Sequence, residues 1–295
     1  MDTTGKLETR GTTRAAGFWL CGGRRIPLDS PKIMGIVNVT PDSFSDGGRW
    51  FDAEQAVAHA LQLAAEGADI LDIGGESTRP GAAEVSETEE ARRVLPVIRS
   101  LASQCDTPIS VDTRRSAVAR AAVEAGACIV NDIMPFANDK AMAAVVRETG
   151  AGLVVMHMRG TPQTMAGLTA YEDVLGEVEA ALSAALGYAE SQGIPASRAV
   201  VDPGIGFAKT AAQSVAVLAA TARFARLAPV LIGASRKRFI GELCGEPSAG
   251  NRLGGSIGAA VWGALQGASV VRVHDVLATR QALTVIGALM RGEDA

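Results

Sequence analysis

The sequence lacks the features that mark membrane proteins and nucleic-acid-binding proteins. None of its apolar runs approaches the ~18 residues that a membrane-spanning helix needs. Lys and Arg number 28 against 32 Asp and Glu, so no basic field exists to hold a nucleic-acid backbone or an anionic membrane. The first sixteen residues are polar and contain no apolar segment typical of a signal peptide. We therefore expect a cytoplasmic protein that binds neither nucleic acid nor membranes.

Cysteine pairs and nucleotide-binding motifs are also missing. The four cysteines are scattered, and none forms a CxxC pair or stands beside a His at metal-ligand spacing. This usage predicts free thiols in a reducing compartment. No GxGxxG or Walker pattern follows the first predicted strand, which argues against an open dinucleotide-binding sheet.

What the sequence does contain is a series of short, nearly continuous apolar runs. Hydrophobic residues make up 47% of the 295 residues, enough for a large buried core. Unbroken runs of this kind are typical of strands that are buried on both faces of a parallel sheet. The predicted strands are Lys32–Asn38, Asp69–Gly74, Pro108–Asp112, Cys128–Asp132, Gly152–His157, Ala199–Asp202, Val230–Gly233 and Val270–Val273.

Stretches with helical periodicity lie between these strands. Several end at a glycine that precedes a small residue and the next strand, as at Gly67, Gly126 and Gly267, which is the usual signal of a helix C-terminus. The predicted helices include 53–66, 88–101, 171–192, 211–226, 255–266 and 277–290.

Eight strand–helix units fit either a closed barrel or an open doubly wound sheet. Eight units in about 260 residues are the usual size of a closed barrel. We therefore predict an α/β protein with a single (β/α)8 TIM barrel domain over residues 32–292. Residues 1–31 form an N-terminal extension, in which 18–28 predict a short hairpin that could cover the bottom of the barrel.

Polar residues end almost every predicted strand. In a barrel of this kind the active site lies at the C-terminal ends of the strands. A single Asp or Asn there is more often a turn former or helix cap. A whole ring of buried polar groups is costly unless it binds something, so the set favours a functional site. The ring comprises Asn38, the segment 74–81, Asp112, Asn131 with Asp132, His157, Asp202, Ser235 to Lys237, and Arg272 with His274.

The residue types indicate the ligand. Asp112, Asn131 and Asp202 supply acceptors and amide donors that match a flat heterocycle with an amino group, a ring NH and a carbonyl. Arg79, Arg272 and His274 suit a phosphate. The segments 40–48 and 76–82 combine Gly or Pro with charged residues and could close as lids. In the first of these, Asp42 and Asp46 fit either metal binding or capping of the next helix.

Seven segments together resemble the dihydropteroate synthases. The match extends from about residue 20 to 290 and keeps the motifs in order. The segments are Met34–Gly48, Asp72–Gly81, Ser110–Thr113, Asn131–Ile133, Asp202–Phe207, Ser235–Lys237 and Arg272–Asp275.

The resemblance implies a transferase of folate biosynthesis that joins 4-aminobenzoate to a dihydropterin carrying a CH2-diphosphate and uses Mg2+. It implies that Asn38 binds Mg2+. The pterin ring would contact Asp112, Asn131, Ile133, Asp202 and Lys237, and the diphosphate would contact Thr78, Arg272 and His274. The 4-aminobenzoate pocket would include Phe44, Arg79, Pro80, Phe207, Ser235 and Lys237. Asp112, Asp202, Lys237, Arg272 and His274 would be the catalytic set.

Two local departures and two rival functions accompany this hypothesis. Ala208 stands where many members have Gly, and 166–170 lacks the usual Pro, which leaves the outer edge of the 4-aminobenzoate pocket and sulfonamide sensitivity open. A pterin-dependent methyltransferase would need no diphosphate site. A non-catalytic pterin-binding paralogue would not need the retained Asn38, Lys237, Arg272 and His274. The family is commonly homodimeric, and the Gly- and Ala-rich C-terminal helices would suit close packing.

Overall fold

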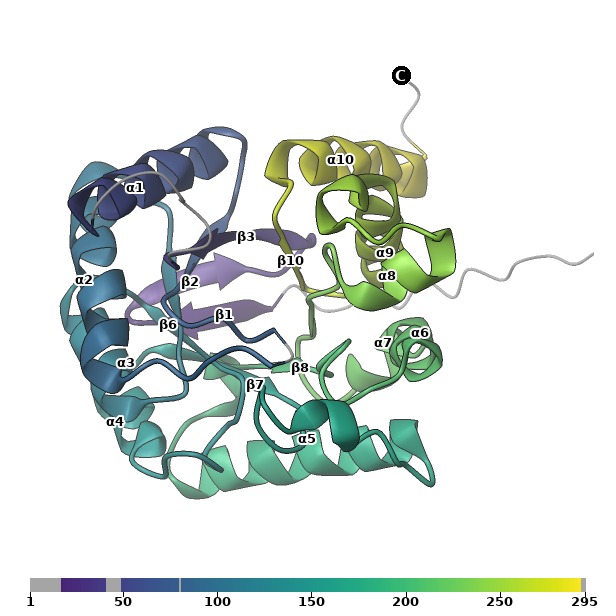
Figure 1. Ribbon diagram of the computed structural model, residues 1–295, viewed down its shortest axis with the longest axis horizontal. Coiled ribbons are helices and arrows are strands. Elements are labelled where there is room, and N and C mark those ends of the chain that lie inside the picture. Colours follow the sequence, from purple (N-terminus) through teal and green to yellow (C-terminus); the bar gives the residue numbers. More distant parts are fainter. Residues whose placement is uncertain (1–16, 41–48, 80, 293–295) are drawn as a thin grey trace, which may run out of the picture.

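The computed structural model describes residues 17–40, 49–79 and 81–292. Eight parallel strands form one sheet in the order β8-β7-β6-β5-β4-β3-β10-β9, and a bridge between Val201 and Val230 joins its two ends. The backbone N–H of Val201 also donates to the carbonyl of Pro229 at 2.9 Å. The sheet is therefore a barrel, and the predicted TIM barrel fold is confirmed (Figure 1). Its strands are β3 (Lys32–Asn38), β4 (Ile70–Gly74), β5 (Ile109–Asp112), β6 (Ile129–Asp132), β7 (Gly152–Met156), β8 (Ala199–Asp202), β9 (Leu231–Ile232) and β10 (Val270–Val273).

Helices surround this barrel, and the apolar stripe of each packs on the outer face of the sheet (Figure 1). All six predicted helices are present, two of them in altered form. No range was predicted from the sequence for α3, α4 and α8, which are short and give few turns of periodicity, although Gly126 marked the end of α3. The helices are α1 (Arg49–Ala65), α2 (Glu87–Gln104), α3 (Ser116–Glu124), α4 (Met142–Thr149), α5 (Val174–Ser191), α6 (Ala211–Ala219), α7 (Thr221–Phe224), α8 (Arg238–Cys244), α9 (Leu253–Leu265) and α10 (Val276–Arg291).

Local side-chain bonds to the backbone explain the two altered helices. The segment 171–192 begins as helix α5 only at Val174, because the carboxylate of Asp173 accepts from the N–H of Leu175 and caps the helix. The segment 211–226 divides into α6 and α7 at Ala220. There the hydroxyl of Thr221 donates to the carbonyl of Leu218 at 2.7 Å, a bond that competes with the regular helix.

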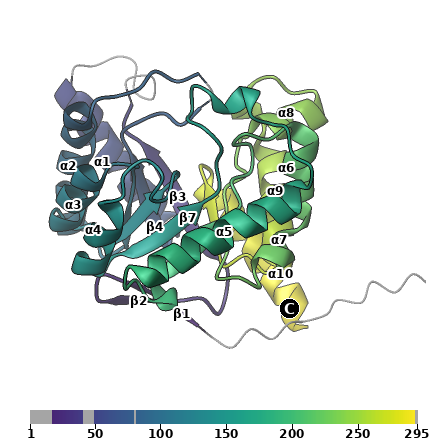
Figure 2. The same cartoon turned by 90° about the horizontal axis from the view of Figure 1, so that it is seen from below.

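A two-stranded hairpin covers the N-terminal ends of the barrel strands. It consists of β1 (Phe18–Cys21) and β2 (Arg24–Pro27), joined by two glycines with positive φ. Trp19 is fully buried in a cluster with interior residues of the barrel strands, including Met34 and Ile70. Its indole N–H donates to the carbonyl of Arg198 at 2.8 Å. Figure 2 shows the hairpin below the barrel, so the polar ring must be at the opposite end.

No helix within the described ranges is long and apolar enough to cross a membrane. All four cysteines are free, as predicted.

Candidate active site

One small cavity lies at the C-terminal ends of the barrel strands and brings most of the predicted site residues together. The βα units from β4 to β10 each supply one or two lining residues, since parallel strands all end at the same rim. Met156 and Gly233 complete the lining, although the sequence did not single them out as site residues. The lining residues are Thr78, Asp112, Asn131, Ile133, Met156, Asp202, Phe207, Gly233, Lys237 and Arg272.

Arg272 is the centre of this cavity's polar network. Its Nε donates to Asp72 at 2.6 Å, and its Nη2 donates to Asp112 at 2.7 Å. The side-chain amide of Asn131 donates to the same oxygen of Asp72 at 3.1 Å. Asp72 is fully buried, and both donors bind its Oδ2, while its Oδ1 has no hydrogen-bond partner among the described residues. Asp72 thus orients two site residues without lining the cavity itself.

Sequence reasoning did not assign a role to Asp72. The signal was present, since Asp72 is a carboxylate in the middle of an apolar strand. What the sequence does not contain is its partner, because Arg272 lies 200 positions away. Strands β4 and β10 come together because both pair with β3, which places Asp72 and Arg272 in the same interior.

Burial shifts the ionisation of the cavity's acids and of its lysine. The pKa of Asp112 is raised to about 7 by burial, against the lowering effect of Arg272. Burial also raises the pKa of Asp202, whose Oδ1 accepts from the N–H of Gly204 at 2.7 Å. The pKa of Lys237 is lowered to about 8 by burial, with Asp202 opposing the shift. Burial opposes the charge of Arg272, but Asp72 and Asp112 outweigh it and raise its pKa.

Phe207 and Lys237 form one wall of the cavity. The ammonium of Lys237 lies 3.8 Å from the centroid of the Phe207 ring, a cation–π contact. Lys237 immediately precedes helix α8, while Phe207 follows β8 in the loop that leads to α6. An ammonium beside an aromatic ring can bind the carbonyl of a ligand while the aromatic ring packs against the ligand's flat ring.

Ser235 and His274 pair beside the cavity without lining it. The hydroxyl of Ser235 lies 3.0 Å from Nδ1 of His274 and accepts from the backbone N–H of His274 at 3.2 Å. The pKa of His274 is lowered to about 3 by burial and by the neighbouring Arg236 and Arg272. The imidazole is therefore neutral at pH 7, and it can serve an anion as a hydrogen-bond donor but not as a charge.

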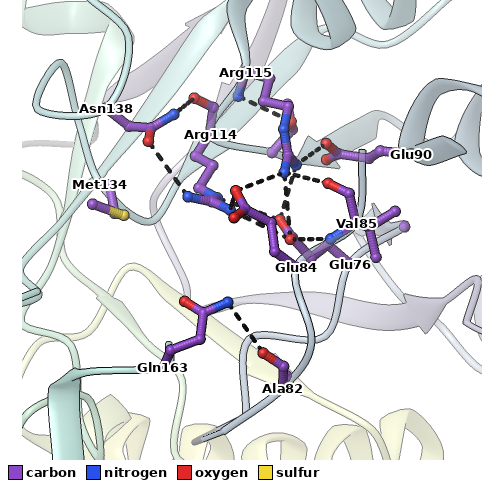
Figure 3. Close-up of polar contacts among 12 residues, drawn as sticks. Glu76, Ala82, Glu84, Val85, Glu90, Arg114, Arg115, Met134, Asn138 and Gln163 are labelled. Atoms are coloured by element: carbon purple, nitrogen blue, oxygen red, sulfur yellow. Dashed lines mark hydrogen bonds and ion pairs between the residues drawn. The ribbon is translucent and has the colours of Figure 1, made fainter. Parts of the chain in front are cut away.

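The loop between β4 and α2 carries Thr78 and is held by buried ion pairs (Figure 3). The carboxylate of Glu76 accepts from Arg115 at 2.9 Å and from Arg114 at 3.3 Å, and both arginines belong to the next βα unit. Arg115 also pairs with the fully buried Glu90 of helix α2 at 2.5 Å. The sequence reasoning missed these arginines. Their signal was an Arg–Arg pair two residues after the strand-ending Asp112.

The same loop contacts the segment that follows β7. The N–H of Gly81 donates to the carbonyl of Pro162 at 3.0 Å, and the amide of Gln163 donates to the carbonyl of Ala82 at 3.2 Å (Figure 3). Arg79 is exposed on the loop and does not line the cavity. Phe44, Pro80, Asp42 and Asp46 lie outside the described residues.

Asn38 ends strand β3 near the cavity and is half-buried. Its side chain has no hydrogen-bond partner among the residues that the structure describes, so its carbonyl oxygen is available to a ligand. Those same ranges contain no cluster of three or more His, Cys, Asp or Glu side chains that could hold a metal ion. Mg2+ commonly uses only one or two protein oxygens and takes the rest from water and substrate phosphates. Asn38 fits such a shared site.

Comparison with known proteins identifies the family. The model of the pterin-binding enzymes matches residues 34–274. The chain is 46% identical to the dihydropteroate synthase of Neisseria meningitidis serogroup B, covering 93% of this chain and 98% of that one. The structure of Xanthomonas albilineans dihydropteroate synthase with 4-aminobenzoic acid has a TM-score of 0.89 and 48% identity, covering 94% and 99%. The structure of the same enzyme with 7,8-dihydropteroate has a TM-score of 0.84 and 46% sequence identity. The match covers 92% of this chain and 97% of that chain. The chain belongs to the pterin-binding enzyme family and, within it, to the dihydropteroate synthases.

Proposed function

We propose that the cavity joins 4-aminobenzoate to (7,8-dihydropterin-6-yl)methyl diphosphate and forms 7,8-dihydropteroate and diphosphate for folate biosynthesis. The observation that carries the proposal is the convergence of Asp112, Asn131, Asp202 and Lys237 on one buried cavity. Solved structures of a 46–48% identical relative contain 4-aminobenzoic acid and 7,8-dihydropteroate. Similar substrates therefore suit this chain.

The deep part of the cavity would hold the pterin. In this proposal Asp202 accepts from the amino group and ring NH of the heterocycle, and Lys237 donates to its carbonyl. Asp112 and Asn131 face the other ring nitrogens, while Ile133 packs against the ring. Asn131 is suited to this because its amide is fixed by the bond to Asp72.

The rim around β4 and β10 would hold the diphosphate. Arg272 supplies a full positive charge, Thr78 supplies a hydroxyl and His274 supplies an N–H. Because Ser235 lies at Nδ1 of His274, its hydroxyl can donate there and leave the proton on Nε2. We assign Asn38 as the protein ligand of Mg2+, which when bound neutralises charge on the diphosphate.

The 4-aminobenzoate would lie between the pterin and solvent. Phe207 and Lys237 form its inner wall in this proposal, and Ser235 lies next to it. Arg79 extends from the β4–α2 loop to the carboxylate. The proposal also includes Phe44 and Pro80, which remain predictions from the sequence.

The chemistry follows from these positions. The C–O bond to the diphosphate breaks, and its electron pair leaves with the diphosphate while Arg272 and His274 stabilise the leaving charge. The remaining cation is delocalised into the dihydropterin, where the carboxylates of Asp112 and Asp202 stabilise it. The arylamine nitrogen then forms the C–N bond and releases one proton to solvent or diphosphate. Exclusion of water protects the cation, which needs no Ser or Cys nucleophile.

We also infer the unit boundaries, the compartment and the assembly. Residues 32–292 would form the barrel unit and 1–31 its N-terminal extension. Four free cysteines suit a cytoplasmic location. Helices α9 and α10 expose large apolar side chains, which suits a homodimer interface. These side chains are Trp262, Leu265, Leu277, Val285, Leu289 and Met290.

A single assay tests the reaction. Purified protein with Mg2+, the pterin diphosphate and labelled 4-aminobenzoate should give labelled dihydropteroate. Absence of product under conditions where a control synthase works would contradict the proposal.

The Asp112→Asn variant should keep its thermal unfolding transition and lose about 100-fold in kcat/KM, because the amide cannot stabilise the cation by charge. Wild-type kinetics in this variant would remove Asp112 from the pterin pocket.

A further inference from the structure

His157 and Lys209 form a buried polar pair outside the cavity. Both side chains are 6% exposed. The Nζ of Lys209 donates to Nδ1 of His157 at 2.9 Å, to the carbonyl of Gly204 at 2.9 Å and to the carbonyl of Phe207 at 3.1 Å. Three acceptors match the three protons of an ammonium, so the charge of Lys209 is compensated without a carboxylate in contact.

Burial lowers the pKa values of both members of the pair. Burial, reinforced by the charges of Lys209 and Arg159, lowers the pKa of His157 to about 3. The imidazole is neutral, and Nδ1 must be the unprotonated nitrogen in order to accept from Lys209. Burial lowers the pKa of Lys209 to about 7, while the nearby carboxylate of Asp202 opposes that shift.

The segment that Lys209 fixes is a tight turn in a strained conformation. The N–H of Phe207 donates to the carbonyl of Gly204 at 3.1 Å, and Lys209 binds the carbonyls at both ends of that turn. Gly204 has φ 67°, and a Cβ there would overlap the carbonyl oxygen of His157. Ala208 has φ 46°, which costs a non-glycine residue about 1–2 kcal/mol. Such a turn persists only when its surroundings fix it.

Phe207 lies inside this turn, and its ring contacts the ammonium of Lys237. The contacts run from His157 at the end of β7 to Lys209, from Lys209 to the turn 204–207, and from the turn to the wall of the cavity. We propose that Lys209 and His157 are a positioning pair that holds Phe207 against the arylamine. This inference rests on the proposed function, which assigns Phe207 to the 4-aminobenzoate pocket.

Steady-state kinetics of matched variants test the pair. Lys209→Met keeps the length of the side chain and removes its three donors, and we expect KM for 4-aminobenzoate to rise about tenfold while KM for the pterin diphosphate stays within about twofold. His157→Leu should give the same pattern. His157→Asn should restore most of the affinity, because its Oδ1 can replace Nδ1 as the acceptor. The exposed Lys140 provides the control, and Lys140→Met should leave both constants unchanged.

Amide hydrogen exchange of peptides covering 203–210 gives a second readout that does not depend on activity. Faster exchange there in Lys209→Met and His157→Leu, with the rest of the barrel unaltered, supports the pair. Native exchange and native KM in Lys209→Met would overturn the inference, as would equal increases in both KM values. Phe207→Ala tests the assignment of Phe207 to the 4-aminobenzoate pocket separately from the proposal that Lys209 and His157 fix the turn. If it leaves KM for 4-aminobenzoate unchanged, the pocket assignment fails, while the exchange data still judge whether the pair fixes the turn.

Discussion

At the scale of single residues, burial brings the ionisation of the proposed catalytic groups close to neutral pH. The pKa of Asp112 is raised to about 7 by burial, and that of Lys237 is lowered to about 8 by burial. The reaction needs Asp112 as a carboxylate and Lys237 as an ammonium. Activity should therefore fall as pH decreases through about 7 and as pH increases through about 8.

A bell-shaped profile of kcat/KM for the pterin diphosphate checks this prediction. In the free enzyme Asp112 faces Arg272 and the carboxylates of Asp72, Glu90 and Asp132. Lys237→Met should lower kcat/KM and remove the basic limb, leaving the acidic limb in place. A flat profile between pH 6 and about 9 would contradict the assigned ionisation states.

Ala208 shows how a backbone conformation decides the effect of a substitution. Replacing a buried Ala by Gly loses about 1 kcal/mol of methyl burial and gives the unfolded chain about 0.5–1 kcal/mol of extra entropy. At Ala208 these losses are offset by relief of about 1–2 kcal/mol of left-handed strain. We expect Ala208→Gly to change the free energy of unfolding by less than about 1 kcal/mol.

Ala119, in helix α3, is the matched control for Ala208→Gly. It is fully buried and lies in the middle of a regular helix, so Gly should cost roughly 1.5–2 kcal/mol there. Urea unfolding of the two variants measures both values. Equal losses would show that the turn at Ala208 is not strained.

At the scale of elements, the turn between β5 and α3 fixes the position of the neighbouring β4–α2 loop. The turn follows Asp112 and carries Arg115, which binds Glu76 of the β4–α2 loop and Glu90 of α2 (Figure 3). Arg115→Met should cost about 3 kcal/mol of stability, because the buried Glu90 loses its ionic partner and Glu76 keeps only Arg114. It should also raise KM for the pterin diphosphate about fivefold, since Thr78 loses its fixed position.

Arg120→Met is the control for this effect. Its ion pair with Glu148 is almost half exposed on both sides, so its loss should cost less than about 1 kcal/mol and leave KM unchanged. Thermal unfolding curves measure stability, and initial rates measured well below the unfolding transition report binding separately. An Arg115→Met enzyme with native KM would show that the ion pairs stabilise the barrel without positioning the loop.

Sequence patterns predicted the elements better than their connections. Each barrel strand was recognisable as a short apolar run, and most of the runs lead to a polar residue that lines one cavity. Partners across the barrel were not predictable, since Arg272 and Asp72 lie 200 positions apart in the chain. Lys209 has no strand-end position, so nothing local connected it to His157. The break between α6 and α7 depends on a hydroxyl bond that periodicity does not record.

At the scale of the whole molecule, one barrel end is sealed and the other is polar. Among the described residues, the β1–β2 hairpin covers the lower end with apolar side chains around Trp19, and the cavity lies at the opposite rim (Figure 2). The alternation of strands and helices also fits an open sheet. The bridge between Val201 and Val230 excludes that arrangement.

The assembly is a further property of the whole surface. Leu289 is 71% exposed and Val285 is 59% exposed on helix α10, and Trp262 of the adjacent helix α9 is 45% exposed. Large apolar side chains gathered on neighbouring helices are typical of an interface. We expect light scattering after size exclusion to give the mass of a dimer for the native chain and of a monomer for the double variant Val285→Glu, Leu289→Glu. Phe18→Glu, on the β1–β2 hairpin and 43% exposed, should remain dimeric. A monomeric native chain, or a double variant that keeps the dimer mass, would place the interface elsewhere or remove it.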